Sequence, residues 1–410
     1  MPRIRSLAFG VAACGAVALA ACSNDHNNFL KAPTPAGGAI FQSYVALGNS
    51  ITAGYQSGGI NDSTQRQSYA ALLAAAMGTR YAYPSLAMPG CPPPVKNFQT
   101  QERVGTGVIT STTCFLRDPT SIAFALNNVA VPGATVIDPA STSTAFSNSL
   151  TFLFLGGKSQ ALKALDADPT FISLWLGNND VLAAAVTGLL VPTAGVSPGI
   201  TAVATFQTNY DNTIGVLTQA RRLKGGVLIG VVNVANLPIL FPAAALFNPA
   251  FKAGFDAFAG GPTTLLPTCT PLSTSLISFQ LAPTIRSGAH PALIGCEKNS
   301  VPATAVGDIF VLDAAEQTTL GTTVASYNAY IQTKAASLGF AYFDPNPPLA
   351  AQKATGAIPT VPNLADPINP FGLLFSLDGV HPRRAAHVLV ANGVIDAINA
   401  KYATTLARVQ

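Results

Sequence analysis

The feature that most constrains the fold is a set of short apolar runs that lack polar alternation. In an antiparallel sheet with one face in water, polar residues would recur at every second position. Strands that are buried on both faces, as in a parallel sheet covered by helices, need no such alternation. The runs are YVALG at 44–48, ALNNVAVPG at 125–133, FISLWLG at 171–177, GVLIGVVNV at 226–234 and FAYFDP at 340–345.

Alanine-rich stretches of helical character separate these runs. They are SYAALLAAAMG at 68–78, TTVASYNAYIQTKAASLG at 322–339 and RRAAHVLVANGVIDAINAKYATTL at 383–406. The first two end at a glycine, the residue that most often follows a helix. Buried strands that alternate with helices predict an α/β fold whose parallel sheet is covered on both faces. Residues 40–410 then form one domain, which is long for this class unless it carries insertions.

Two regions interrupt the alternation, at about 79–121 and about 240–305. We interpret both as insertions on the loop side of the sheet, which makes them candidates for substrate-binding walls or a lid. The run 226–247 is apolar enough to suggest a membrane span. Its asparagines and prolines disfavour a helix in lipid, so a buried strand followed by a loop is the better interpretation.

Chemically useful residues follow the apolar runs, where ligands bind in parallel α/β sheets. Gly48-Asn49-Ser50 follows the first run, Gly133 follows the second, and Gly177-Asn178-Asn179-Asp180 follows the third. Asp378 and His381 stand just before the last predicted helix. We expect these segments to share one rim of the sheet.

Together these residues supply what acyl transfer from an ester requires. A serine hydroxyl needs a base to take its proton, and a base needs a carboxylate to fix its tautomer. We assign these roles to Ser50 as nucleophile, His381 as base and Asp378 as its carboxylate partner. The oxyanion of the tetrahedral intermediate needs preset donors, which the backbone N–H groups of Ser50 and Gly133 and the side chain of Asn179 can provide.

These four stretches resemble the signature blocks of the GDSL (SGNH) esterases and lipases, in the same order along nearly the whole mature chain. The resemblance gives Ser50, Asp378 and His381 the catalytic roles and Gly133 and Asn179 the oxyanion roles. It also implies a three-layer α/β/α fold of the flavodoxin-like kind, with a central parallel sheet of about five strands. One departure is Asn49, where the family usually has aspartate, with Ile51 in place of its leucine.

Several polar residues have plainer interpretations. His290 is the reserve candidate for the base, but no carboxylate lies near it in sequence. His387 is expected to be a packed or surface residue of the closing helix, and His26 lies in the polar tether. Asp180 reads as a cap or scaffold residue, and Trp175 is expected to pack in the core.

The first 21 residues have the pattern of a secretory signal peptide. A basic start, MPRIRS, precedes the uncharged run LAFGVAACGAVALAAC, and the chain turns polar at SNDHNN. The run is shorter than the roughly 20 apolar residues of a membrane-spanning helix. Leu19 to Cys22 resembles the lipobox of bacterial lipoproteins, which implies that Cys22 is lipidated and anchors the mature chain. Ser23 and Asn24 resemble an outer-membrane sorting signal, and residues 22–39 read as a polar tether.

Four cysteines remain beyond Cys22, and an even number in an exported protein predicts two disulfides. Four cysteines allow three pairings, of which we favour the sequence-local one, Cys91–Cys114 with Cys269–Cys296. Each bridge would contribute roughly 3 kcal/mol in the chain-entropy model. A zinc site lacks Cys-x-x-Cys spacing and nearby histidines, so we expect no metal.

Charge disfavours nucleic acid as a partner. The formal net charge of +4 falls to +2 when Arg3 and Arg5 leave with the signal peptide, and no basic run remains. Charged residues make up 10% of the chain, against about 25% in an average globular protein, and hydrophobic residues 49%. Such a composition suits a protein that works close to lipid.

We therefore expect an exported, lipid-anchored, monomeric serine esterase or lipase of the bacterial envelope. It would hydrolyse lipid or fatty acyl esters through an acyl-Ser50 intermediate, without a cofactor. Acetyl groups on polysaccharides are the alternative substrate, because the family also removes those. A non-catalytic surface lipoprotein that binds a glycan or a partner is the rival from another class. Intact Ser50, Asp378 and His381 speak against that rival.

Overall fold

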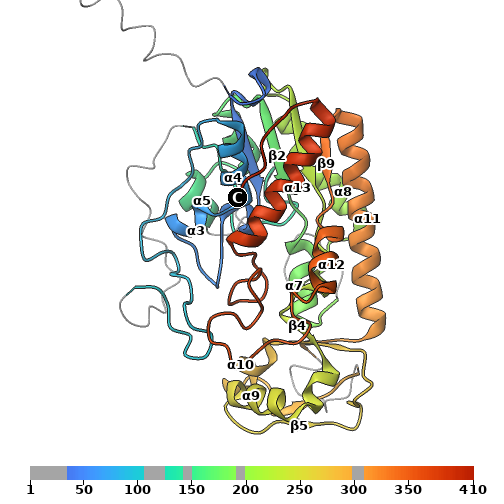
Figure 1. Cartoon of the computed structure of the whole chain (residues 1–410). Helices are drawn as coiled ribbons and strands as arrows, with labels where there is room; N and C mark the ends of the chain where they lie inside the picture. The colour runs from blue at the N-terminus through green and yellow to red at the C-terminus, as the bar shows by residue number, and fades with distance from the viewer. Residues whose placement is uncertain (1–34, 106–124, 142–149, 191–198, 298–308) are drawn as a thin grey trace, which may run out of the picture.

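Four parallel strands form the central sheet of the computed structural model, which describes residues 35–105, 125–141, 150–190, 199–297 and 309–410 (Figure 1). Their order is β1-β2-β3-β9, and the register sets Tyr44 beside Phe171 and Val227 beside Ala341. Every residue of β1, β2 and β3 is buried, as the runs without polar alternation predict. The strands are β1 at Tyr44–Gly48, β2 at Phe171–Trp175, β3 at Gly225–Ile229 and β9 at Ala341–Phe343.

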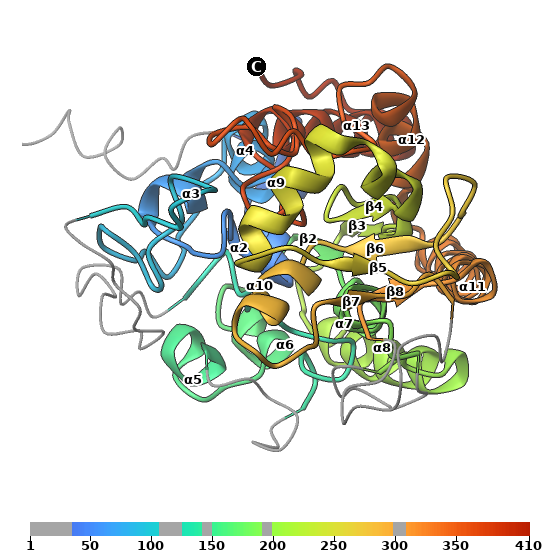
Figure 2. The same cartoon turned by 90° about the horizontal axis from the view of Figure 1, so that it is seen from below.

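Helices cover both faces of this sheet, so the three-layer α/β/α fold is confirmed (Figure 2). Successive side chains of a strand point to opposite faces. In β1, Tyr44 and Ala46 pack into one core and Val45 and Leu47 into the other. The first core contains side chains of α4 (Tyr69–Met77) and α13 (Arg384–Tyr402); the second contains those of α6 (Gln160–Leu165), α8 (Val203–Leu217) and α11 (Ala314–Leu338).

The run at 125–133 lies beside β1 but does not form a regular strand. Its one bridge joins Asn128 to Ala46. The Asn128 side chain instead accepts a hydrogen bond from Ala130 N–H at 3.0 Å and donates one to Thr52 O at 2.9 Å. Side-chain bonds of this kind compete with a strand ladder, and Pro132 has no N–H to extend one. The sheet thus has four strands and one bridged edge segment.

Capping residues set the ends of the long helices. Ser68 Oγ accepts from Ala71 N–H at the start of α4, and Gly78 ends the helix with a φ of 62°. Helix α11 begins at Ala314, earlier than expected, because Asp313 and Glu316 form a reciprocal capping box.

The second expected insertion is a small lobe with its own secondary structure, at the lower end of the molecule in Figure 1. It follows β3 in the chain, and the chain returns to the central sheet at β9 after helix α11. The disulfide Cys269–Cys296, with an S–S distance of 1.99 Å, lies in this lobe and confirms one predicted pair. The lobe contains an antiparallel sheet of β4 (Leu240–Pro242), β6 (Leu276–Ser278) and β8 (Val311–Leu312), a parallel pair of β5 (Thr264–Leu265) and β7 (Leu293–Ile294), and helices α9 (Pro249–Ala259) and α10 (Leu281–Arg286).

An aromatic cluster joins the lobe to the rest of the chain. The Phe98 ring, from the first insertion, lies 4.6 Å from Phe258 and 5.2 Å from Phe279 of the lobe. It also lies 5.4 Å from Phe371, which precedes Asp378 in the chain. Aromatic contacts of this geometry stabilise beyond their buried area. The cluster therefore fixes the segment that leads to Asp378 against both insertions.

Some predictions lie outside the described residues. These are the signal peptide, Cys22, most of the 22–39 tether, and Cys114 with its predicted bridge to Cys91. Within the described residues, no helix has both the length and the apolar character of a membrane span. The remaining elements are η1 (Ala39–Phe41), α2 (Ser50–Ala53), α3 (Asp62–Arg66), α5 (Leu150–Leu155), α7 (Asn179–Thr187), η3 (Val234–Asn236), η4 (Ala243–Phe247) and α12 (Asn346–Ala354).

Candidate active site

Ser50 stands at the first turn after β1, where the chain must pass close to β2. A Cβ atom on Gly48 would lie 2.3 Å from Thr52 Oγ1 and 2.8 Å from Trp175 O, so glycine is required there. Asn49 then caps the turn, because its Oδ1 accepts a hydrogen bond from Ile51 N–H at 3.1 Å. The carboxamide thus makes the cap contact that an aspartate would make, and Ser50 is held in a fixed, nearly buried position.

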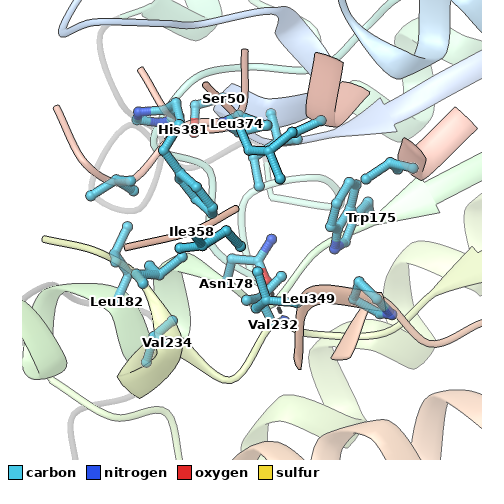
Figure 3. Close-up of a pocket in the computed structure, with 18 of the residues that line it drawn as sticks. Ser50, Trp175, Asn178, Leu182, Val232, Val234, Leu349, Ile358, Leu374 and His381 are labelled. Carbon is cyan, nitrogen blue, oxygen red and sulfur yellow. Dashed lines mark hydrogen bonds between the residues drawn. The ribbon is translucent and has the colours of Figure 1, made fainter. Parts of the chain in front are cut away.

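The structure brings Ser50, His381 and Asp378 into one hydrogen-bonded chain. Ser50 Oγ lies 2.8 Å from His381 Nε2, and His381 Nδ1 lies 2.8 Å from Asp378 Oδ2. Figure 3 shows Ser50 and His381 side by side at one end of a pocket. Since an ionised carboxylate can only accept a hydrogen bond, Nδ1 carries the proton and donates to Asp378 Oδ2. Nε2 then presents its lone pair to the serine hydroxyl.

Both carboxylate oxygens of Asp378 accept hydrogen bonds from groups other than the imidazole. Its Oδ1 accepts from the Ser376 hydroxyl at 2.9 Å and from the backbone N–H groups of Val380 and His381 at 3.0 and 2.8 Å. Its Oδ2 also accepts from Gly58 N–H at 2.9 Å. Burial alone would raise the pKa of Asp378. The charge and hydrogen bonds of His381, with the backbone bonds, lower that pKa well below its usual range.

The ring of Tyr55 covers one side of the imidazole. The Tyr55 and His381 ring centroids are 4.9 Å apart. Burial, and then the nearby charge of Asp378, raises the pKa of Tyr55 to about 12. The tyrosine therefore stays neutral beside the imidazole and adds no competing charge.

The two other predicted donors come from neighbouring segments. Gly133 has a φ of 82°, in the left-handed region that favours glycine. Asn179 is the first residue of α7, and its Nδ2 donates to Ala134 O at 2.8 Å. An amide nitrogen carries two hydrogens, so one remains for a further acceptor. Asn179 also lines the same pocket as Ser50.

Asp180 is a scaffold residue, as the sequence indicated. Its Oδ2 accepts from Val136 N–H at 2.9 Å and its Oδ1 from the Thr201 hydroxyl at 2.7 Å. Burial raises the pKa of Asp180 to about 7. The residue ties the segment after Gly133 to the start of α7 and so fixes the spacing of Gly133 and Asn179.

The other described histidines lie elsewhere. His290 is buried in the lobe, and its Nδ1 is 2.7 Å from Pro291 O. His387 is buried in α13, where its Nδ1 accepts from Tyr69 N–H at 3.1 Å. The structure therefore brings His381, and neither of these two, to the serine. In the described residues, no group of three or more His, Cys, Asp or Glu side chains is placed to hold a metal ion.

The family model described as GDSL-like lipase/acylhydrolase matches residues 44–394 of the chain. The chain belongs to the GDSL-like lipase/acylhydrolase family. It is accordingly a serine ester hydrolase. No curated protein matches this GDSL hydrolase at a significant level.

Solved structures with a similar course of the chain share little sequence with this GDSL hydrolase. An extracellular lipase from Streptomyces rimosus is 14% identical, with 88% of this chain and 99% of that chain covered and a TM-score of 0.35. A catalytic mutant of an acetylxylan esterase from Geobacillus stearothermophilus is 11% identical, with 90% and 97% covered and a TM-score of 0.38. A phospholipase A1 from Streptomyces albidoflavus is 16% identical, with 88% and 99% covered and a TM-score of 0.32.

A deep apolar pocket adjoins Ser50 and His381 in this GDSL hydrolase (Figure 3). The empty space inside it, with the open solvent at its mouth included, is about 860 Å³. Side chains from η3, α7, α12 and α13 and from the loop before Asp378 form its walls. The apolar lining includes Leu182, Val232, Val234, Leu237, Leu349, Ile358, Leu374, Phe375 and Leu389.

Some site residues had no signal in the sequence. Gly58 and Ser376 hold Asp378 but belong to no motif, and Gly58 is separated from Asp378 by 320 positions. Trp175 is buried as expected and packs edge-on against Tyr69, yet it also lines the pocket. The pocket walls come from segments spread along the chain between Asn49 and Val390, so only the folded chain reveals them.

Proposed function

We propose that this protein hydrolyses esters with lipid-like acyl chains by a double displacement at Ser50. The proposal rests on one observation: Ser50 and His381 both line an apolar pocket. The hydrogen-bonded chain from Ser50 to Asp378 supplies a nucleophile with its base. The pocket supplies a place for an acyl chain that is shielded from water.

In the first half of the reaction, Ser50 Oγ attacks the ester carbonyl carbon while its proton passes to His381 Nε2. The carbonyl oxygen becomes an oxyanion, and the N–H groups of Ser50, Gly133 and Asn179 donate to it. The intermediate then collapses, the bond to the alcohol oxygen breaks, and His381 returns the proton to the departing alcohol. The product is an ester of Ser50 with the acyl group.

In the second half, a water molecule takes the place of the alcohol. His381 Nε2 accepts a proton from the water, whose oxygen attacks the acyl carbonyl. Collapse of the second intermediate breaks the bond to Ser50 Oγ, which recovers its proton from His381. The ionised Asp378 stabilises the imidazolium in both halves and keeps Nδ1 protonated.

The apolar walls favour a fatty acyl group over acetyl. Burying apolar surface contributes roughly 0.8 kcal/mol for each methylene group. An acetyl group would leave most of the pocket unfilled, whereas a longer chain gains contact with Leu182, Val234 and Leu349. We therefore place lipid or fatty acyl esters before acetylated polysaccharide as the substrate.

A series of p-nitrophenyl esters from acetyl to palmitoyl tests this proposal, with wild type beside Ser50→Ala. We expect kcat/KM to rise from the acetyl ester toward medium or long chains and Ser50→Ala to lose essentially all activity, on the order of 10⁶-fold. A maximum at the acetyl ester would move the substrate to acetylated glycans. No hydrolysis by wild type would instead favour a binding protein.

A pocket-filling variant sharpens the test of chain length. Leu349 lines the pocket, so Leu349→Trp should lower activity on long-chain esters and spare the acetyl ester. Leu272→Trp is the matched control, because Leu272 is 88% exposed on the lobe. Equal activity of the two variants along the series would contradict an acyl-binding role for the pocket.

The proposal extends to where the enzyme works. The segment MPRIRSLAFGVAACGAVALAAC supports export with lipidation of Cys22, and the polar stretch after it is a suitable tether. We propose an outer-membrane lipoprotein that acts as a monomer. An anchor of this kind holds the pocket close to lipid substrates.

A further inference from the structure

Three residues that line the pocket have a buried N–H donor without a hydrogen-bond partner among the described residues: Asn49 Nδ2, Asn178 Nδ2 and Trp175 Nε1. Asn49 directly precedes Ser50, whereas Asn178 and Trp175 stand at the end of β2. The Asn178 and Trp175 side chains are almost completely buried, with residue exposures of 5% and 2%. In Figure 3 both nitrogens face the interior of the pocket. Buried polar groups are nearly always paired, so each unpaired group calls for an explanation.

The orientation of the Asn178 amide is fixed by its other end. Its Oδ1 accepts a hydrogen bond from Val232 N–H at 2.9 Å. A backbone N–H group can only donate, so the amide oxygen must face it and the NH₂ group must face the pocket. The indole nitrogen of Trp175 is likewise a donor with no acceptor capacity. This part of the pocket therefore offers donors to its occupant.

The residues that line the pocket restrict which kind of acceptor group can bind to these donors. Among the described residues that line the pocket, none is Lys, Arg, Asp or Glu. A carboxylate would enter this apolar space without a cation to pair with, which is unfavourable. A hydroxyl group would also need an acceptor for its own proton. A neutral carbonyl oxygen needs donors alone.

We propose that Asn178 and Trp175 recognise a carbonyl oxygen within the acyl part of the substrate, in addition to the scissile ester carbonyl. The preferred substrates are then esters whose acyl chain bears a keto group or a further ester linkage. This inference rests on the proposed function, because it requires that the acyl chain occupies the pocket. Asn178 and Trp175 act here as residues that determine specificity.

The test compares p-nitrophenyl octanoate with its keto derivatives, in which the keto group is moved along the chain one carbon at a time. The quantity measured is the ratio of kcat/KM for each keto ester to kcat/KM for the plain ester, after subtraction of a blank without enzyme. We expect one keto position to be preferred by roughly threefold to tenfold, which is what one hydrogen bond contributes. A ratio cancels any loss of folded protein in a variant.

Two variants assign the preference to the donors. Trp175→Phe keeps an aromatic ring against Tyr69 but removes the indole N–H, and Asn178→Leu removes the amide. Each should bring the preferred ratio toward one. The control Leu349→Ala, which changes an apolar wall, should alter plain and keto esters in the same proportion.

The outcomes separate this inference from the proposal on which it rests. Hydrolysis of octanoate with no preferred keto ester would overturn the inference and leave the esterase function intact; the donors would then serve bound water. A preference that survives both variants would also overturn it. No hydrolysis of any ester in the series would overturn both.

Discussion

The buried imidazole of His387 makes the stability of the fold depend on pH in one direction. His387 is fully buried in α13, and its Nδ1 accepts from Tyr69 N–H at the start of α4. Burial, and then the nearby charge of His381, lowers the pKa of His387 from 6.5 to about 3. The folded protein therefore favours the neutral ring. Its contribution to stability is complete above pH 6.5 and is lost as the pH falls toward 3.

The size of this effect follows from the two pKa values. Between pH 6.5 and about pH 4.5, the unfolded chain binds a proton at His387 and the folded chain does not. Each pH unit in this window lowers the free energy of unfolding by about 1.4 kcal/mol. The expected loss from this one residue at about pH 4.5 is therefore about 3 kcal/mol.

The assay is urea unfolding of wild type and His387→Asn at neutral pH and at about pH 4.5. Asparagine does not titrate, and its side-chain oxygen can still accept from Tyr69 N–H. Wild type should lose about 3 kcal/mol more than the variant between the two pH values. Asp138 and Asp180, whose pKa values are raised to about 6 and about 7 by burial, titrate in both proteins and so cancel. Equal losses in the two proteins would refute the reasoning.

Three further predictions concern the reaction and the anchor. Asp378→Asn should lower kcat on the order of 10⁴-fold, because an amide no longer fixes the tautomer of His381, and a loss confined to KM would contradict this role. Asn179→Ala should lower kcat by roughly 10² to 10³, as removal of an oxyanion donor does. Unchanged turnover would exclude Asn179 as an oxyanion donor. Cys22→Ser should move the protein from the membrane fraction to the soluble fraction, and continued tight membrane association would argue against lipidation.

Much of the fold was predictable because strands that are buried on both faces lack polar alternation in their sequence. The runs at 44–48 and 171–177 contain no polar alternation, and both became strands covered on two faces. The run at 125–133 has a similar composition. Its asparagines bind nearby backbone and one proline lacks an N–H, so it makes only a bridge. Composition alone does not separate a strand from a segment that lies beside one.

The candidate site was predictable for a different reason. Parallel strands end at one edge, so Ser50, Gly133 and Asn179 were expected to lie near one another. The local spacing of Asp378 and His381 then permitted a direct hydrogen bond, and the structure shows it at 2.8 Å.

The supporting contacts were not predictable from one sequence. Ser57 N–H donates to the Ser376 hydroxyl across 319 positions, and Gly58 N–H reaches Asp378 in the same way. No periodic pattern or motif in the sequence indicates either contact. The donors of Asn178 and Trp175 are recognisable only when their lack of partners in the folded chain is known.

The measurement that tests the central claim most directly is the site at which a phosphonate ester attaches. A p-nitrophenyl octylphosphonate resembles the tetrahedral intermediate and carries a chain for the apolar pocket. We predict one equivalent bound covalently to the peptide that contains Ser50, faster than for the methylphosphonate, as peptide mass spectrometry would show. Attachment at another residue, or no attachment at all, would contradict the assignment of Ser50 as the nucleophile.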